Sequence, residues 1–112
     1  MAIHKRDVGD VTIFEMEGKF LGGPETMEIH FQVKELVSED RNKIVFDMEK
    51  AKLLNSTALG CIMSSLMTLR NADGNLKLCC LNERMKGLFK VTDIITVFET
   101  FDTVEEAIAS YQ

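Results

Sequence analysis

Two adjacent hydroxyl side chains, Ser56 and Thr57, lie at the centre of the stretch LLNSTALG, residues 53–60. An apolar run precedes this stretch and a run with helical spacing follows it, so the pattern predicts a turn from a strand into a helix. Ser, Thr and Asn at such a turn are typical N-caps, because their oxygens accept hydrogen bonds from amide groups that lack helical partners. A hydroxyl at the carboxyl end of a buried strand can equally belong to a functional surface, since open α/β sheets expose such surfaces there.

The cysteines and histidines do not have the spacing of a metal or redox site. Cys79 and Cys80 are adjacent in a predicted strand, so their side chains are expected on opposite faces, while Cys61 is expected in a helix. His4 and His30 stand alone in the sequence. The chain also shows no nucleophile with a histidine base, no catalytic carboxylate pair and no GxxxxGK[ST] phosphate loop. We therefore expect a protein without catalytic residues, cofactor or bound metal, whose thiols serve packing.

Length, composition and charge limit the remaining functions. The chain has 112 residues, of which 46% are hydrophobic, so residues 1–112 are expected to form a single domain around one core. The formal net charge of -5 leaves no basic surface for a phosphate backbone, so nucleic acid is not expected as a partner. No apolar run has the length of a signal peptide or a membrane span. We expect a cytoplasmic protein that does not insert into a membrane.

Two periodicities alternate along the chain. Apolar patterning predicts strands over residues 11–18, 42–48, 75–81 and 95–98, with a segment around Ile3 pairing as a hairpin with the first of them. Helical spacing predicts helices over residues 22–40, 57–74, 82–91 and 102–111. In the last helix, Thr103 and Glu106 are placed for a capping box. This alternation is typical of an α/β domain with a mostly parallel sheet and right-handed crossovers.

The predicted helix over residues 57–74 has two unequal faces. One face repeats apolar residues at helical spacing, and the other carries the small side chains of Thr57, Gly60, Cys61, Ser64 and Thr68. A solvated helix face usually carries Lys, Glu and Gln, whereas small residues let another backbone approach closely. We expect a protein partner on this face. The alternative is that a neighbouring helix of the same chain covers it.

Met27 and Phe31 form an apolar pair on the preceding predicted helix. They lie opposite the stripe that is expected to face the sheet, which consists of Ile29, Val33, Leu36 and Val37. The pair is predicted to widen the core stripe or to make a local contact over the turn at residues 22–23. The alternative is an apolar anchor for a partner or for a second copy of the chain.

Several short motifs, taken in their order along the chain, resemble the STAS domain of bacterial anti-sigma factor antagonists. In that family a buried strand ends in Asp and leads to an Asp-Ser-Ser/Thr-Gly-Leu-Gly motif that opens a helix, and the EGKFLGGPETMEI segment corresponds to a Gly-rich turn before the first helix. The positions that match the family are Asp47, Ser56, Thr57, Leu59, Gly60, Thr92, Phe98 and Glu105 to Ala107. The resemblance spans nearly the whole chain. It implies a STAS-type single domain with a mixed, mostly parallel sheet of four to five strands and about four helices.

The resemblance also implies a function. Such a domain is a binding switch: an anti-sigma factor serine kinase, which also sequesters a sigma factor, phosphorylates a serine that here matches Ser56. The unphosphorylated domain binds the kinase and frees the sigma factor, and a serine phosphatase resets the cycle. The partner-binding residues expected from the resemblance and from the small helix face are Gly22, Gly23, Asn55, Ser56, Thr57, Gly60, Cys61 and Ser64. A weak homodimer is a further option.

Three positions depart from the family pattern around the serine. Asn55 and Leu21 replace aspartates, and Ala58 replaces a glycine. The two missing carboxylates lie where a kinase would engage its substrate. The alternative function is therefore a non-catalytic STAS subunit of a larger regulatory or transporter assembly that works without a phosphorylation cycle. An enzyme or ligand-binding protein is a weaker alternative, because the sequence has no catalytic carboxylate pair, no nucleophile with a histidine base and no phosphate-binding loop.

Overall fold

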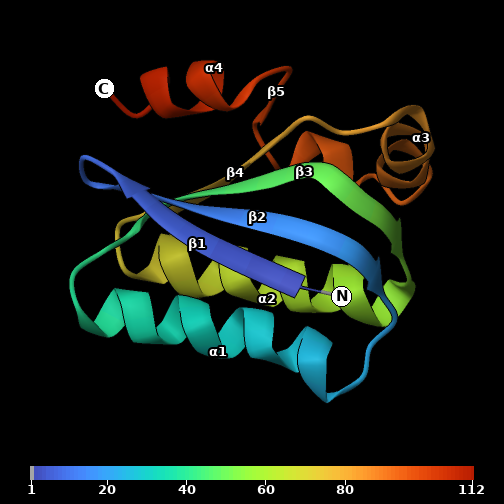
Figure 1. Ribbon diagram of the computed structural model, residues 1–112, viewed down its shortest axis with the longest axis horizontal. Helices are drawn as coiled ribbons and strands as arrows, with labels where there is room; N and C mark the ends of the chain where they lie inside the picture. Colours follow the sequence, from blue (N-terminus) through green and yellow to red (C-terminus); the bar gives the residue numbers. More distant parts are fainter. Residues whose placement is uncertain (1) are drawn as a thin grey trace.

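The computed structural model describes residues 2–112, apart from the side chains of Glu25 and Ile95 (Figure 1). Strands and helices alternate along most of this range, as the sequence patterns predict. The elements are β1 (Ala2–Val8), β2 (Val11–Phe20), α1 (Pro24–Ser38), β3 (Lys43–Leu54), α2 (Ser56–Asn71), β4 (Asn75–Cys79), α3 (Glu83–Val91), the short 3-10 helix η1 (Ile94–Thr96), β5 (Thr100–Phe101) and α4 (Val104–Ala109).

The described strands form one mixed sheet in the order β1-β2-β3-β4-β5. β1 pairs antiparallel with β2 through a tight turn at Gly9, where φ is +62°, and this confirms the predicted hairpin. The pairs β2-β3, β3-β4 and β4-β5 are all parallel. The parallel strands end at the same edge of the sheet, so the segments that follow β2 and β3 are brought together there.

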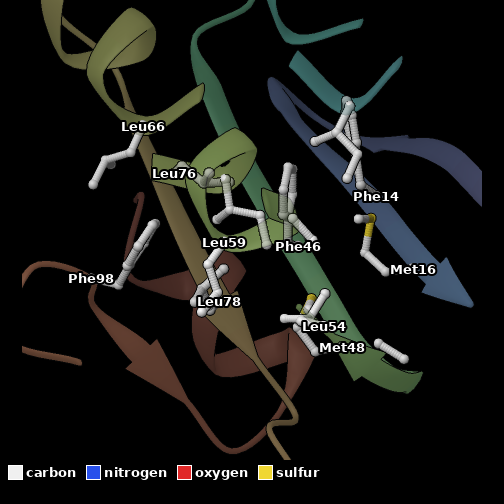
Figure 2. Close-up of a cluster of buried hydrophobic side chains, with 14 of the residues drawn as sticks. Phe14, Met16, Phe46, Met48, Leu54, Leu59, Leu66, Leu76, Leu78 and Phe98 are labelled. Atoms are coloured by element: carbon white, nitrogen blue, oxygen red, sulfur yellow. The ribbon is translucent and has the colours of Figure 1, made fainter. Parts of the chain in front are cut away.

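Helices cover both faces of the sheet (Figure 1). α1 and α2 lie side by side on one face, and α4 lies on the other. Between the sheet and the α1/α2 layer, the rings of Phe14 and Phe46 stack with centroids 5.1 Å apart, and Leu59 and Leu66 of α2 pack into the same core (Figure 2). A smaller apolar cluster under α4 contains Val11, Ile13, Val45, Cys79 and Ala107.

Helices α1 and α4 form within the ranges predicted for them, residues 22–40 and 102–111. Pro24 occupies the first turn of α1, where its missing N–H costs no helical hydrogen bond, and Ile29, Val33 and Leu36 are buried against the core as expected. Thr103 caps α4, because its Oγ1 accepts a hydrogen bond from Glu106 N at 3.1 Å.

The predicted strand over residues 95–98 is wrong. Asp93 adopts a left-handed conformation with φ of +59° directly after α3, and Ile94–Thr96 then turns as a 3-10 helix. Phe98 is buried with its ring 6.3 Å from that of Phe89, so its apolar character serves the core beside α3. The last strand follows at Thr100–Phe101. A run of β-branched residues indicated strand locally, and packing against α3 overrode that preference.

Candidate functional site

The ends of β2 and β3 bring two short connections together at one edge of the sheet. Phe20 and Leu54 are the last residues of the two strands and are register partners. Asn55 N donates to Phe20 O at 3.2 Å, which extends the pairing by one hydrogen bond. The loop at residues 21–23 therefore lies beside the turn that opens α2. These are the two segments in which most of the predicted partner-binding residues occur.

Asn55, and not Ser56, is the N-cap of α2. The side-chain Oδ1 of Asn55 accepts from Ala58 N at 2.9 Å, and its carbonyl accepts from Leu59 N at 3.0 Å. The expected cap among Asn55, Ser56 and Thr57 is therefore present, but Ser56 does not supply it, because Ser56 is already the first helical residue. Its side chain is exposed. The N–H groups of Ser56 and Thr57 have no hydrogen-bond partner within the described residues, so the positive end of a helix of 16 residues lies beside this hydroxyl.

The local backbone requires a glycine at position 22, which is also one of the predicted partner-binding residues. Its φ of +86° is a conformation that glycine adopts without a steric penalty, and its N–H donates to Thr26 Oγ1 at 3.0 Å. A β-carbon at Gly22 would lie only 2.8 Å from Thr57 Cβ, so the loop and the start of α2 are in close contact. Gly23 is different, because nothing lies within 4 Å of the β-carbon it lacks. It is the exposed N-cap residue of α1 and has no capping side chain.

α1 covers one flank of the small-residue face of α2. Cys61 is only 8% exposed, and its Sγ lies 3.7 Å from Met27 Sδ of α1. His30 Nε2 forms a 2.8 Å hydrogen bond with Thr68 Oγ1 and fixes the same two helices together. The prediction that Cys61 lies on the partner-binding surface is wrong for this reason: a helix of the same chain occupies that flank.

The remaining small residues of α2 face solvent. Thr57, Gly60 and Ser64 are exposed, and we call them the outer face of α2. Met67, which is 50% exposed, continues this face because it follows Gly60 by seven residues and Ser64 by three. Sequence patterning assigned Met67 no role, although its helical spacing from Gly60 and Ser64 indicated this position.

Exposed apolar side chains also flank this face on the neighbouring segments. Met27 and Phe31 of α1 are 57% and 56% exposed, so the prediction that they widen the core stripe is wrong, and Leu21 of the adjoining loop is 55% exposed. Met27 and Phe31 line a shallow cavity of about 360 Å³ together with His30 and Lys34. Burial, with a smaller effect from the Lys34 ammonium, lowers the pKa of His30. The surface is thus apolar with small residues at its centre, which suits contact with another protein.

The prediction that Cys79 and Cys80 point to opposite faces of a strand is wrong. β4 ends at Cys79, and Cys80 adopts a left-handed conformation with φ of +62°. The two thiols therefore lie close together, near the carboxylate of Asp47. Burial raises the pKa of both thiols.

None of the helices within residues 2–112 is long and apolar enough to cross a bilayer.

Comparison with known proteins gives one family. The family model described as the STAS domain matches residues 2–107. A Thermotoga neapolitana protein, named as a candidate anti-sigma factor antagonist and homologue of TM1081, is 26% identical over 78 residues, which are 70% of this chain and 69% of that protein.

Solved structures share the fold at lower sequence identity. The crystal structure of a candidate anti-sigma factor antagonist from Thermotoga maritima has a TM-score of 0.82 at 21% identity, covering 96% of this chain and 92% of that one. The phosphorylated Bacillus cell fate determinant SpoIIAA has a TM-score of 0.78 at 16% identity, covering 99% and 100%. A sulfate transporter family protein from Wolinella succinogenes has a TM-score of 0.73 at 16% identity, covering 92% and 85%. These likenesses confirm the predicted fold.

Proposed function

This chain belongs to the STAS domain family, and from that membership we propose that it is an anti-sigma factor antagonist. It acts in the cytoplasm as a protein-binding module without catalytic activity of its own. It binds an anti-sigma factor serine kinase and so releases the sigma factor that the kinase holds. Phosphorylation of Ser56 by that kinase ends the binding, and a serine phosphatase restores it. The relative named as a candidate antagonist supports the general role.

The observation that carries this proposal is the position of Ser56 at the start of α2. Its exposed side chain adjoins two N–H groups, those of Ser56 and Thr57, that lack partners among the described residues, and no acidic residue occupies the first turn of α2. A phosphoryl group at this position would meet free amides and the positive helix end, which stabilise an anion. The fold is therefore expected to tolerate the modification.

The same position explains how a phosphate would end partner binding. Ser56 lies next to Thr57, the first residue of the outer face of α2, and close to the loop that contains Leu21. A phosphate would add a charge of about -1.5 to -2 to a surface that is otherwise small and apolar. A partner packed on the outer face would have to desolvate that charge. Loss of binding then requires no change in the domain fold.

The alternative function is a constitutive STAS subunit of a larger regulatory or transporter assembly. Asn55 and Leu21 favour it, because neither supplies the carboxylate that the family pattern places near the serine. The Oδ1 atom of Asn55 caps α2, a role that an aspartate would fill equally well. In this alternative the outer face of α2 still binds a protein, but Ser56 is never modified.

The experiment that separates these functions uses the full chain and the proteins that it captures from its native cells. We expect an ATP-binding serine kinase among the captured proteins and, after incubation with that kinase and ATP, one phosphate on Ser56 by mass spectrometry. Thr57→Ala should still be phosphorylated, and Ser56→Ala should not. Capture of transporter subunits, with no phosphate on Ser56, would reject the antagonist and favour the constitutive subunit.

A further inference from the structure

Asp47, Cys79 and Cys80 form a compact group of metal-ligating side chains on the face of the sheet opposite α1 and α2. One carboxylate oxygen of Asp47 and the two Sγ atoms all lie within 4.8 Å of one another. Asp47 and Cys79 are register partners on the adjacent parallel strands β3 and β4. Both are buried, and Cys80 is half-buried. The proposed partner-binding surface contains none of these three residues.

Two backbone features hold this group in place. The left-handed conformation of Cys80, with φ of +62°, turns its side chain back toward Cys79, and Cys80 N donates to Phe101 O of β5 at 3.0 Å. Glu49 N donates to Asp47 Oδ1 at 3.1 Å, which orients the carboxylate. A hydrogen bond of this kind to a ligating carboxylate is a common second layer of metal sites. Asp47 and Cys79 thus lie on strands, and Cys80 directly follows β4 and is held by its backbone hydrogen bond to β5.

We propose that Asp47, Cys79 and Cys80 bind one Zn²⁺ ion. Two thiolates and a carboxylate are ligands that zinc accepts, and soft sulfur ligands discriminate against Mg²⁺ and Ca²⁺. In a tetrahedral zinc site with Zn–S bonds of about 2.3 Å, the two sulfurs lie about 3.8 Å apart. A sulfur and the carboxylate oxygen would lie about 3.5 Å apart, so the present group must close by about 1.3 Å at most from its limit of 4.8 Å, which side-chain rotation can supply.

The surroundings provide an entry path and a fourth coordination position. A cavity of about 450 Å³ is lined by Asp47 and Cys80 and opens to solvent past Glu15, Glu49 and Glu105. These acidic side chains raise the local concentration of a cation. Two thiolates and one carboxylate leave a zinc complex with one net negative charge, and Arg6 in the wall of the same cavity can offset it. Water from the cavity would complete the coordination.

Cobalt substitution in the reduced, metal-free full chain tests this site directly. We expect one equivalent of Co²⁺ to produce the near-ultraviolet absorption of a thiolate–cobalt bond, and one equivalent of Zn²⁺ to abolish it by displacement. Native mass spectrometry should then show a single zinc ion per chain. The metal itself is the probe, so the result does not depend on a partner or on phosphorylation of Ser56.

Substitutions of single ligands decide whether Asp47, Cys79 and Cys80 are the residues that bind the metal. Cys80→Ser, at the half-buried position, should weaken zinc binding at least tenfold and reduce the cobalt–thiolate absorption, and Asp47→Asn should weaken binding as well. Cys61→Ser is the matched control, because Cys61 lies between α1 and α2 and should leave binding unchanged. Melting temperatures without metal exclude loss of fold. Absence of the cobalt–thiolate band in the native chain, or its persistence in well-folded Cys80→Ser, would overturn the proposal.

Discussion

The backbone of Gly22 lies directly against the side chain of Thr57, so that a β-carbon at Gly22 would sit 2.8 Å from Thr57 Cβ. This contact joins the loop after β2 to the first turn of α2. Gly22→Ala should therefore destabilise the protein by about 1–3 kcal/mol, both through this clash and through the left-handed φ of +86°. Gly23→Ser is the control, because nothing lies within 4 Å of its added β-carbon, its φ is -78° and serine is favoured at the N-cap position that Gly23 occupies. Urea unfolding midpoints measure both, and equal losses would show that the contact does not constrain Gly22.

Asn55 and Ser56 should differ sharply in what they contribute to stability. Asn55→Ala removes the side-chain oxygen that accepts from Ala58 N and should cost about 1 kcal/mol. Ser56→Ala should change the free energy of unfolding by less than about 0.5 kcal/mol, because Ser56 is exposed and is not the cap. Ser56→Asp should be neutral or slightly stabilising, since a negative charge suits the helix N-terminus. Thermal and urea unfolding check these values. A loss in Ser56→Ala equal to that in Asn55→Ala would contradict the assignment of the cap.

Binding measurements on the Ser56 variants then separate a switch from a passive surface residue. If phosphorylation controls binding, Ser56→Ala should bind the captured kinase normally, and Ser56→Asp should fold well and bind at least tenfold more weakly. Thr57→Asp tests whether a negative charge elsewhere on this turn is enough to weaken kinase binding. Full-strength binding by well-folded Ser56→Asp, with no phosphate on Ser56 in the native chain, would reject the switch.

Ser64 offers a direct test of the outer face of α2. Its side chain is exposed, so Ser64→Arg should change stability by less than about 1 kcal/mol while it places a long charged group on the proposed surface and abolishes partner binding. Ala109→Arg is the matched control, because Ala109 is a small exposed helical residue of α4 on the opposite face of the sheet. Affinity of the captured partner for both variants gives the answer. Normal binding by Ser64→Arg would show that the interface lies elsewhere on the protein.

His30 should make the stability of the α1/α2 layer dependent on pH. Burial lowers the pKa of His30 in the folded state below its ordinary value of 6.5, so the unfolded chain binds the proton more strongly. Stability from this residue is complete above about pH 6.5 and is lost as the pH falls through the folded-state pKa. Melting temperature between about pH 7.5 and 5 should therefore decline more steeply in the native chain than in His30→Gln. His4→Gln controls for loss of an exposed histidine, and an unchanged slope in His30→Gln would contradict the prediction.

The sequence alone determined the order and type of most elements. The apolar run that opens β2, the stripe of Ile29, Val33 and Leu36 in α1, and the Thr103 cap of α4 are local patterns, and each is confirmed. Such patterns are visible in a sequence because a strand that is buried on both faces carries a nearly continuous apolar run, and a helix that is buried on one face repeats apolar residues with a period of 3.6. The position of Ser56 at the start of α2 could be predicted from such a local pattern as well.

The tertiary structure decided which of these residues are neighbours and which are exposed. Helical spacing placed Cys61 beside Gly60 and Ser64, but only the packing of α1 on α2 buries Cys61 and leaves the other two in solvent. Parallel pairing of β3 with β4 brings Asp47 beside Cys79, although the two residues are 32 positions apart in the chain. The left-handed turn at Cys80 then adds the second thiol. Contacts between distant segments depend on strand register and helix packing, which no local period encodes.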